Sequence, residues 1–158
     1  MTPKPPMLER GRLLDFEVVS NHPEWHDVVL RVSDADVAIR FYHAFVGMGA
    51  VADLRDNQGK RWVQMRPQDL SGAPTLILEE IPRGREDATP IGRVSMGFKL
   101  YNRAEVDRLA AQAEREGCLI LSAHDAGPFR GYTCTVMDPD KNTLEFFHPS
   151  SDRVAFNA

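Results

Sequence analysis

The chain carries one structural pattern twice. Residues 27–47 read as an alternating strand, a capped helix and a closing glycine, and residues 95–117 repeat that order. Three strand-like runs follow each copy, so each half of the chain predicts the element order β-α-β-β-β. A repeat of a whole supersecondary unit constrains the fold more than any single residue, because each unit needs its neighbour to complete a buried core.

Apolar periodicity, helix caps and turn residues give the expected elements of each copy. Ser33 or Asp34 caps the first helix, and Asn102 caps the second. In the first copy we expect a helix over 35–46 and strands over 27–32, 50–55, 60–66 and 75–80. In the second copy we expect a helix over 103–116 and strands over 94–100, 118–123, 131–137 and 143–147.

The fold class that follows is α+β, with two tandem βαβββ modules. One helix covers one face of a four-stranded sheet, so we expect the helices outside and two curled mixed sheets forming a ligand cleft. The expected divisions are an N-terminal extension (1–24), a first module (25–81), a linker (82–93), a second module (94–149) and a C-terminal tail (150–158). Residues 25–149 are expected to act as one domain.

Composition excludes several classes of protein. The 158 residues carry a net charge of −4, which argues against a nucleic-acid partner or a polybasic membrane-surface protein. The apolar runs are only as long as strands, too short to span a bilayer. The first ten residues lack the apolar segment of a secretory signal, so the expected location is cytoplasmic.

Two phrases resemble a known superfamily. They are V-V-L-R-V-S-D, beginning at Val28, and V-M-D-P-D-K-N-T-L-E-F-F at 136–147. Together they resemble the vicinal oxygen chelate superfamily, which includes glyoxalase I, bleomycin-resistance proteins, extradiol dioxygenases and methylmalonyl-CoA epimerase. The resemblance covers about residues 26–149. It implies the paired βαβββ fold, a ligand site in a cleft and, as in many relatives, a homodimer.

The resemblance also implies where a metal ion would bind. Metal-dependent members take four ligands from the first and last strands of each module, usually His or Gln, Glu, His and Glu. Carried over one by one, these positions fall on Asp27, Ile77, Ser95 and Glu145, so three of the four depart from the pattern. We therefore expect no tightly bound metal and no other cofactor. The alternative is one divalent ion held by Glu145, by Asp27 or its neighbour His26, and by Glu79.

Alternation along the strands predicts the side chains that face the cleft. Glu145 is expected to be buried and either to contact the ligand or to form an ion pair with Arg31 or Lys99. Asp27 is the second candidate for a direct role. The predicted ligand-binding residues are Asp27, Arg31, Trp62, Met65, Ile77, Glu79, Ser95, Lys99, Tyr132, Glu145 and Phe147.

Three functions fit this pattern, and the expected partner in each is a small organic molecule. The first is a metal-free protein that sequesters its ligand, as bleomycin-resistance proteins do. The second is a metal-dependent lyase or isomerase of the glyoxalase I or epimerase type. The third is a metal-free enzyme in which Asp27 and Glu145 divide acid and base roles. Loss of the usual ligands favours the first, and Ser95 disfavours an extradiol dioxygenase, whose iron site needs a histidine there.

Overall fold

The computed structural model describes residues 25–68, 74–82 and 92–149. The expected N-terminal extension, most of the expected linker and the C-terminal tail lie outside these described residues. The linker boundaries therefore stay predictions.

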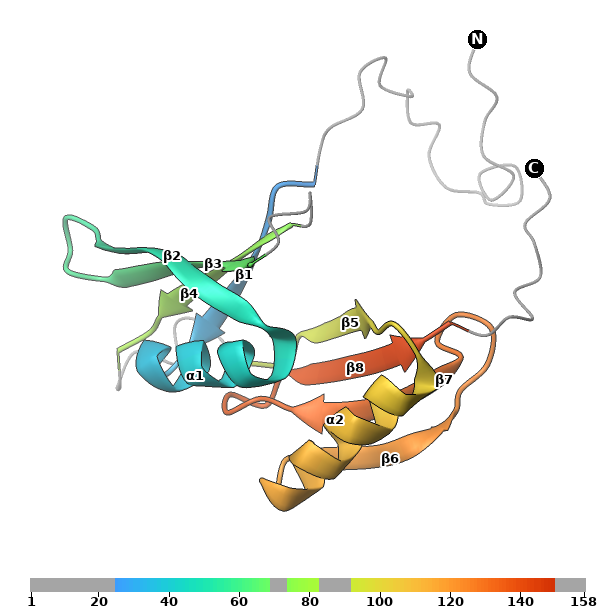
Figure 1. Ribbon diagram of the computed structural model, residues 1–158. Helices are drawn as coiled ribbons and strands as arrows, with labels where there is room; N and C mark the ends of the chain where they lie inside the picture. Colours follow the sequence, from blue (N-terminus) through green and yellow to red (C-terminus); the bar gives the residue numbers. More distant parts are fainter. Residues whose placement is uncertain (1–24, 69–73, 83–91, 150–158) are drawn as a thin grey trace, which may run out of the picture.

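The described chain forms two mixed four-stranded sheets, each with one helix (Figure 1). The first module contains β1 (Asp27–Val32), α1 (Ala35–Val46), β2 (Met48–Arg55), β3 (Arg61–Pro67) and β4 (Thr75–Glu80). The second contains β5 (Ser95–Lys99), α2 (Arg103–Arg115), β6 (Leu119–Asp125), β7 (Tyr132–Met137) and β8 (Thr143–His148). The strand orders are β1-β4-β3-β2 and β5-β8-β7-β6, with β1 parallel to β4 and β5 parallel to β8. The predicted α+β class and repeated modules are confirmed.

Local chemistry explains where the helices begin and end. Of the two expected caps, Asp34 is the residue whose carboxylate accepts the backbone N–H groups of Asp36 and Val37 at the start of α1. Gly47 ends α1 in the left-handed conformation, with φ of 71°. Asn102 caps α2 in the same way as Asp34 caps α1. In the described part of the chain, neither helix has the length and apolar character needed to cross a membrane.

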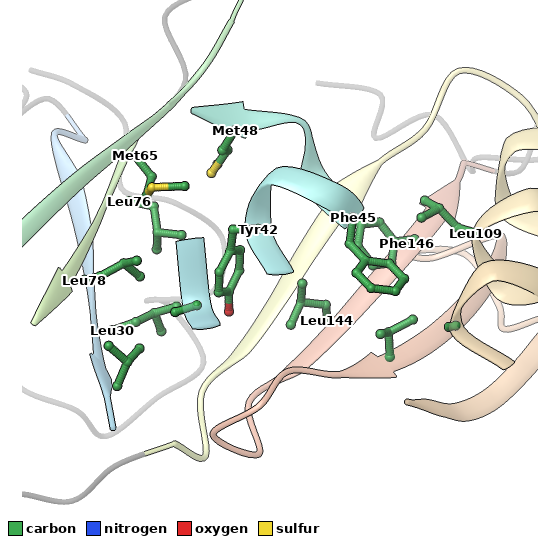
Figure 2. Packing of buried hydrophobic residues seen from close by; sticks show 14 of the residues in the cluster. Leu30, Tyr42, Phe45, Met48, Met65, Leu76, Leu78, Leu109, Leu144 and Phe146 are labelled. Atoms are coloured by element: carbon green, nitrogen blue, oxygen red, sulfur yellow. The ribbon is translucent and has the colours of Figure 1, made fainter. Parts of the chain in front are cut away.

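The core runs through both modules because α1 contacts both. Tyr42 and Phe45 of α1 lie between the side chains of the first sheet and those of β8, as Figure 2 shows with Leu78 and Leu144. Burial of these apolar residues from both sheets in one cluster ties the modules together. The helix α1 is thus not only an outer cover for its own sheet.

A tight turn between β7 and β8 joins the modules through polar contacts. The Tyr42 hydroxyl donates to the Asp138 carboxylate at 2.7 Å, and Ser33 donates through both its backbone N–H and its hydroxyl to Asp140. Asn142 donates to Asp138 through its backbone and its side chain. Asp138 and Asn142 are buried, so these bonds satisfy groups that would otherwise be costly to bury.

Candidate functional site

Each sheet has one face turned toward the helices and one turned away from them. On the first sheet, Leu30 and Leu78 point into the core, and their neighbours point the opposite way. We call this opposite side the first outer face. The paired strands place Asp27, Val29 and Arg31 of β1, Ile77 and Glu79 of β4 and Trp62 of β3 on it.

The second sheet repeats this arrangement. Phe146 and Leu144 point into the core, which turns the alternate residues of β8 away from the helices. We call this side the second outer face. It carries Ser95, Gly97 and Lys99 of β5 and Glu145 and Phe147 of β8, with Gly97 paired to Glu145 and Lys99 to Phe147.

The predicted positions of Met65 and Tyr132 are wrong, because both residues lie on the helix side. Met65 pairs with Leu76 of β4 and is completely buried in the core. Tyr132 donates its hydroxyl to Asp107 of α2, and this bond raises the pKa of the tyrosine. Trp62 and Met65 are three residues apart on the unbroken strand β3, so alternation places them on opposite faces, and Trp62 is the one that lies on the outer face.

The first outer face holds a buried carboxylate that is paired with cations. Glu79 is only 7% exposed, and its oxygens lie 2.8 Å from Lys60 Nζ and 3.5 Å from Arg31 Nε. Lys60 also lies 5.6 Å from the centre of the Trp62 ring. The Trp62 indole N–H donates to Asp56, and that bond holds the pKa of the Asp56 carboxyl below its usual value. Lys60 was not among the predicted site residues.

The carboxylate of the second outer face also has a cation partner, but not an expected one. Glu145 accepts a hydrogen bond from Arg130 Nε, whereas Arg31 and Lys99 were the predicted partners. Arg130 comes from the loop between β6 and β7. The Glu145 side chain is 33% exposed, so it is half-buried rather than buried as predicted. Strand alternation could not identify this partner, because Arg130 precedes its strand.

Gly97 makes room for Arg130 on the sheet. A Cβ atom added at Gly97 would lie 3.1 Å from the Arg130 guanidinium carbon. The same guanidinium carbon lies 4.9 Å from the centre of the Phe147 ring. Arg130 therefore lies across β5 and β8. Glu145 and Phe147 hold it there, and the absence of a side chain at Gly97 leaves room for it. A glycine inside a strand often marks such a close approach, and that signal was available in the sequence.

Asp27 is held differently from the two glutamates. Its Oδ2 atom lies 2.7 Å from Nδ1 of the adjacent His26. The His26 side chain is 81% exposed and the Asp27 side chain 35%, so the pair is largely solvated. Asp27 and Glu145 lie on the outer faces of different sheets.

The donor set does not fit the metal site that the resemblance implies. Ile77 has no atom that can bind a metal, and Ser95 offers only a neutral hydroxyl. Glu145 is already engaged by Arg130. Among the described residues of one chain, no three His, Cys, Asp or Glu side chains come close enough together to hold a metal ion.

A cavity of about 510 Å³ lies between the modules. Its volume falls in the range of sites for small organic ligands. Its apolar lining includes Val28, Met48, Leu76, Met96 and Phe98. Gly97 and Lys99 also line it, so the cavity adjoins the second outer face along the edge strand β5.

The predicted site residues fall into two groups, one on each sheet. The sides of the two sheets that carry the helices meet around α1. Within one chain the two outer faces therefore lie on opposite sides of that shared core. A single cleft lined by both groups stays a prediction.

Comparison with known proteins gives consistent matches. The family model described as the glyoxalase/bleomycin resistance protein/dioxygenase superfamily matches residues 24–146. Protein PA2024 of Pseudomonas aeruginosa, itself uncharacterized, is 34% identical over 125 residues, which cover 78% of this chain and 87% of PA2024.

Solved structures share the fold at lower identity. The antibiotic-binding protein TnmS3 of Streptomyces sp. CB03234 is 24% identical, with a TM-score of 0.60 over 82% of this chain and 98% of TnmS3. The trypanothione-dependent glyoxalase I of Leishmania major is 17% identical, with a TM-score of 0.62 over 80% of this chain and 87% of that enzyme. At such identities the likeness concerns the fold alone.

Proposed function

This chain belongs to the glyoxalase/bleomycin resistance protein/dioxygenase superfamily, and on that basis we propose that it binds a small organic molecule without a tightly bound metal. The observation that carries the proposal is the pairing of Glu145 with a cation of the protein itself. Glu145 is the one glutamate that stands at a ligand position of the family, and Arg130 already neutralises it.

Electrostatics supports this choice over a metal site. A divalent cation at Glu145 would lie next to the Arg130 guanidinium, and two like charges at that distance repel each other. Glu79 offers no alternative, because Lys60 and Arg31 occupy its oxygens. The protein's own cations thus take the place that a metal would need.

The relatives support small-molecule binding as a class of function. One structural neighbour is named as an antibiotic-binding protein and another as a glyoxalase I, so the fold serves both binding and catalysis. The apolar cavity beside β5 has a suitable size and lining for an organic ligand. A protein that only sequesters its ligand needs no more than a cavity of suitable size and lining.

The ligand site is completed, in this proposal, by a second copy of the chain. Val29 and Leu54 on the first outer face are exposed, and so is Leu121 of β6, which pairs with Thr135 next to Glu145. Apolar residues on both outer faces are typical of surfaces that another subunit covers. A homodimer in which the first outer face of one copy meets the second outer face of the other would bring both predicted groups together.

Elemental analysis and a thermal-shift screen test the proposal. We expect purified protein to hold far less than one equivalent of zinc, nickel, iron or manganese per chain. We also expect its melting temperature to be unchanged by EDTA and to rise with at least one small organic compound in the absence of metal, because a ligand of the native state stabilises it. About one equivalent of metal, lost in Glu145→Ala, would contradict the proposal.

A metal-dependent lyase or isomerase is the second candidate, and the position of Glu145 favours it. A metal-free acid/base enzyme using Asp27 and Glu145 requires the second copy, since the two carboxylates lie on different sheets of one chain. Compounds that raise the melting temperature only after a metal is added would favour the lyase or isomerase.

A further inference from the structure

We propose that Arg130, held in place by Glu145, recognises an oxyanion group of the ligand, so that the ligand is an organic carboxylate or phosphonate with an apolar body. The inference rests on the proposed small-molecule binding and adds the chemical class of the ligand. It also gives Glu145 a different role, that of a positioning residue instead of a ligand contact.

The guanidinium of Arg130 is fixed on three sides. Glu145 accepts from its Nε atom, the Phe147 ring lies beneath it, and Gly97 leaves the space that it fills. An arginine that is already oriented loses little conformational freedom when it binds a ligand.

The terminal nitrogens of Arg130 remain available. Its bond to Glu145 uses Nε alone, and no other described residue accepts a hydrogen bond from Nη1 or Nη2. The side chain is 40% exposed. Two parallel N–H groups at the edge of a guanidinium match the two oxygens of a carboxylate or phosphonate.

The surroundings add a second cation and an apolar region. Lys99 lies on the same outer face, paired with Phe147, and has no ion-pair partner among the described residues. Arg130 and Lys99 each carry a positive charge and Glu145 carries one negative charge, so this part of the second outer face has a net positive charge. Gly97 and Lys99 also line the cavity beside β5, so an oxyanion near Arg130 could extend an apolar body toward it.

The first module lacks this arrangement. Val29 of β1 occupies the position that Gly97 holds in β5, because each pairs with the last strand of its module, β4 or β8. Ile77 stands opposite Val29, where Glu145 stands opposite Gly97. The anion site is therefore specific to the second module.

Calorimetric titration with three probes of similar size tests the inference: benzoate, phenylphosphonate and the neutral benzamide. We expect at least one anion to bind at least about tenfold more tightly than benzamide. The anion that binds more tightly identifies the oxyanion class. Equal affinities for all three would overturn the inference while leaving small-molecule binding intact, and so would the absence of saturable binding by both anions if benzamide binds.

Substitutions at Arg130 and Gly97 test whether the Arg130 guanidinium is the group that binds the anion. Arg130→Gln should weaken anion binding at least about tenfold, and Gly97→Val, which introduces the residue of the first module, should weaken it by displacing the guanidinium. Arg108→Gln is the matched control, because Arg108 Nε donates to Glu105 at 3.0 Å on the exposed surface of α2. Unchanged anion affinity in Arg130→Gln would overturn the inference even if Gly97→Val fails to fold.

Glu145→Leu separates positioning from charge, because it removes both the negative charge and the oxygen that accepts from Arg130 Nε. The substitution removes a negative charge, so simple electrostatics predicts tighter anion binding. If Glu145 orients Arg130, anion binding instead weakens several-fold while benzamide affinity stays the same. Tighter binding of benzoate or phenylphosphonate by this variant would overturn the positioning role.

Discussion

A single hydroxyl group, that of Tyr42, connects the two modules through a hydrogen bond. It is fully buried and donates to Asp138, and burial together with the nearby carboxylate raises the pKa of the tyrosine far above its usual value. The phenol therefore stays protonated, and able to donate, above the pH at which an ordinary tyrosine ionises.

Tyr42→Phe should lower the free energy of unfolding by about 1.5–3 kcal/mol, since it removes a hydrogen bond to a buried charged group and leaves Asp138 short of one donor. Chemical denaturation measures the change. Tyr101→Phe is the control, because Tyr101 is 90% exposed and the same atom is lost there at almost no cost. Equal effects of the two substitutions would show that the Tyr42 bond adds no net stability.

Residue-scale inference from the sequence succeeded where neighbours along a strand decide the answer. Alternation is sufficient to assign Glu79 and Glu145 to the side away from the core. Met65 was wrongly expected beside Trp62, although the two residues are three positions apart on β3 and alternation places them on opposite faces. Alternation could not identify the partner of Glu145, which comes from a loop. Contacts between residues far apart in sequence have no local signal except an unexplained glycine such as Gly97.

At the scale of elements, the strand–helix order was predictable, and so were the ends of β1 and β4, but the ends of several other strands were not. The second strand was expected from residue 50 but begins at Met48, and β6 was expected to end at 123 but continues to Asp125. In β6 the added residues pair with the start of β7, as Asp125 does with Tyr132. Hydrogen-bonding partners set these ends, whereas capping residues set the helix ends locally.

Gly92 lies where the chain enters the second module, and it should tolerate no side chain. Its φ is +78°, and an added Cβ atom would lie 1.9 Å from the carbonyl oxygen of Asp140, in the turn that joins the modules. Gly59 has nearly the same φ, +80°, but nothing lies within 4 Å of its added Cβ.

Gly59→Ala should therefore cost about 1–2 kcal/mol, the strain of the left-handed conformation alone. Gly92→Ala should cost clearly more, because backbone atoms must also move. Urea unfolding of both variants gives the difference. Similar losses would mean that the turn shifts easily and does not constrain the entry to the second module.

For the whole molecule, the repeat in the sequence predicted the two sheets but not how they meet. Placement of α1 between the modules depends on Tyr42 and Phe45 packing against β8, which is a contact between residues far apart in the sequence. The apolar face of a helix shows that it is covered, but not by which sheet.

The proposed homodimer gives a prediction at this scale. Leu54→Asp, on the first outer face, should convert the dimer to monomer, because it buries a charge in the proposed interface. Light scattering coupled to size-exclusion chromatography reports the mass. Tyr101→Asp, which changes another exposed residue that lies beyond the end of β5, should leave the mass unchanged. A wild-type protein that elutes as a monomer would remove the basis for a site shared between two copies.

The turn at Asp138–Asn142 has a consequence for how the protein unfolds. It closes the last hairpin of the second module and also holds Ser33 and Tyr42 of the first. Opening that hairpin would break the bonds of Tyr42 and Ser33 to the second module and the packing of α1 on β8 in one event. The duplicated halves should therefore melt together as one cooperative unit, with a single calorimetric transition, and neither half should fold when expressed alone.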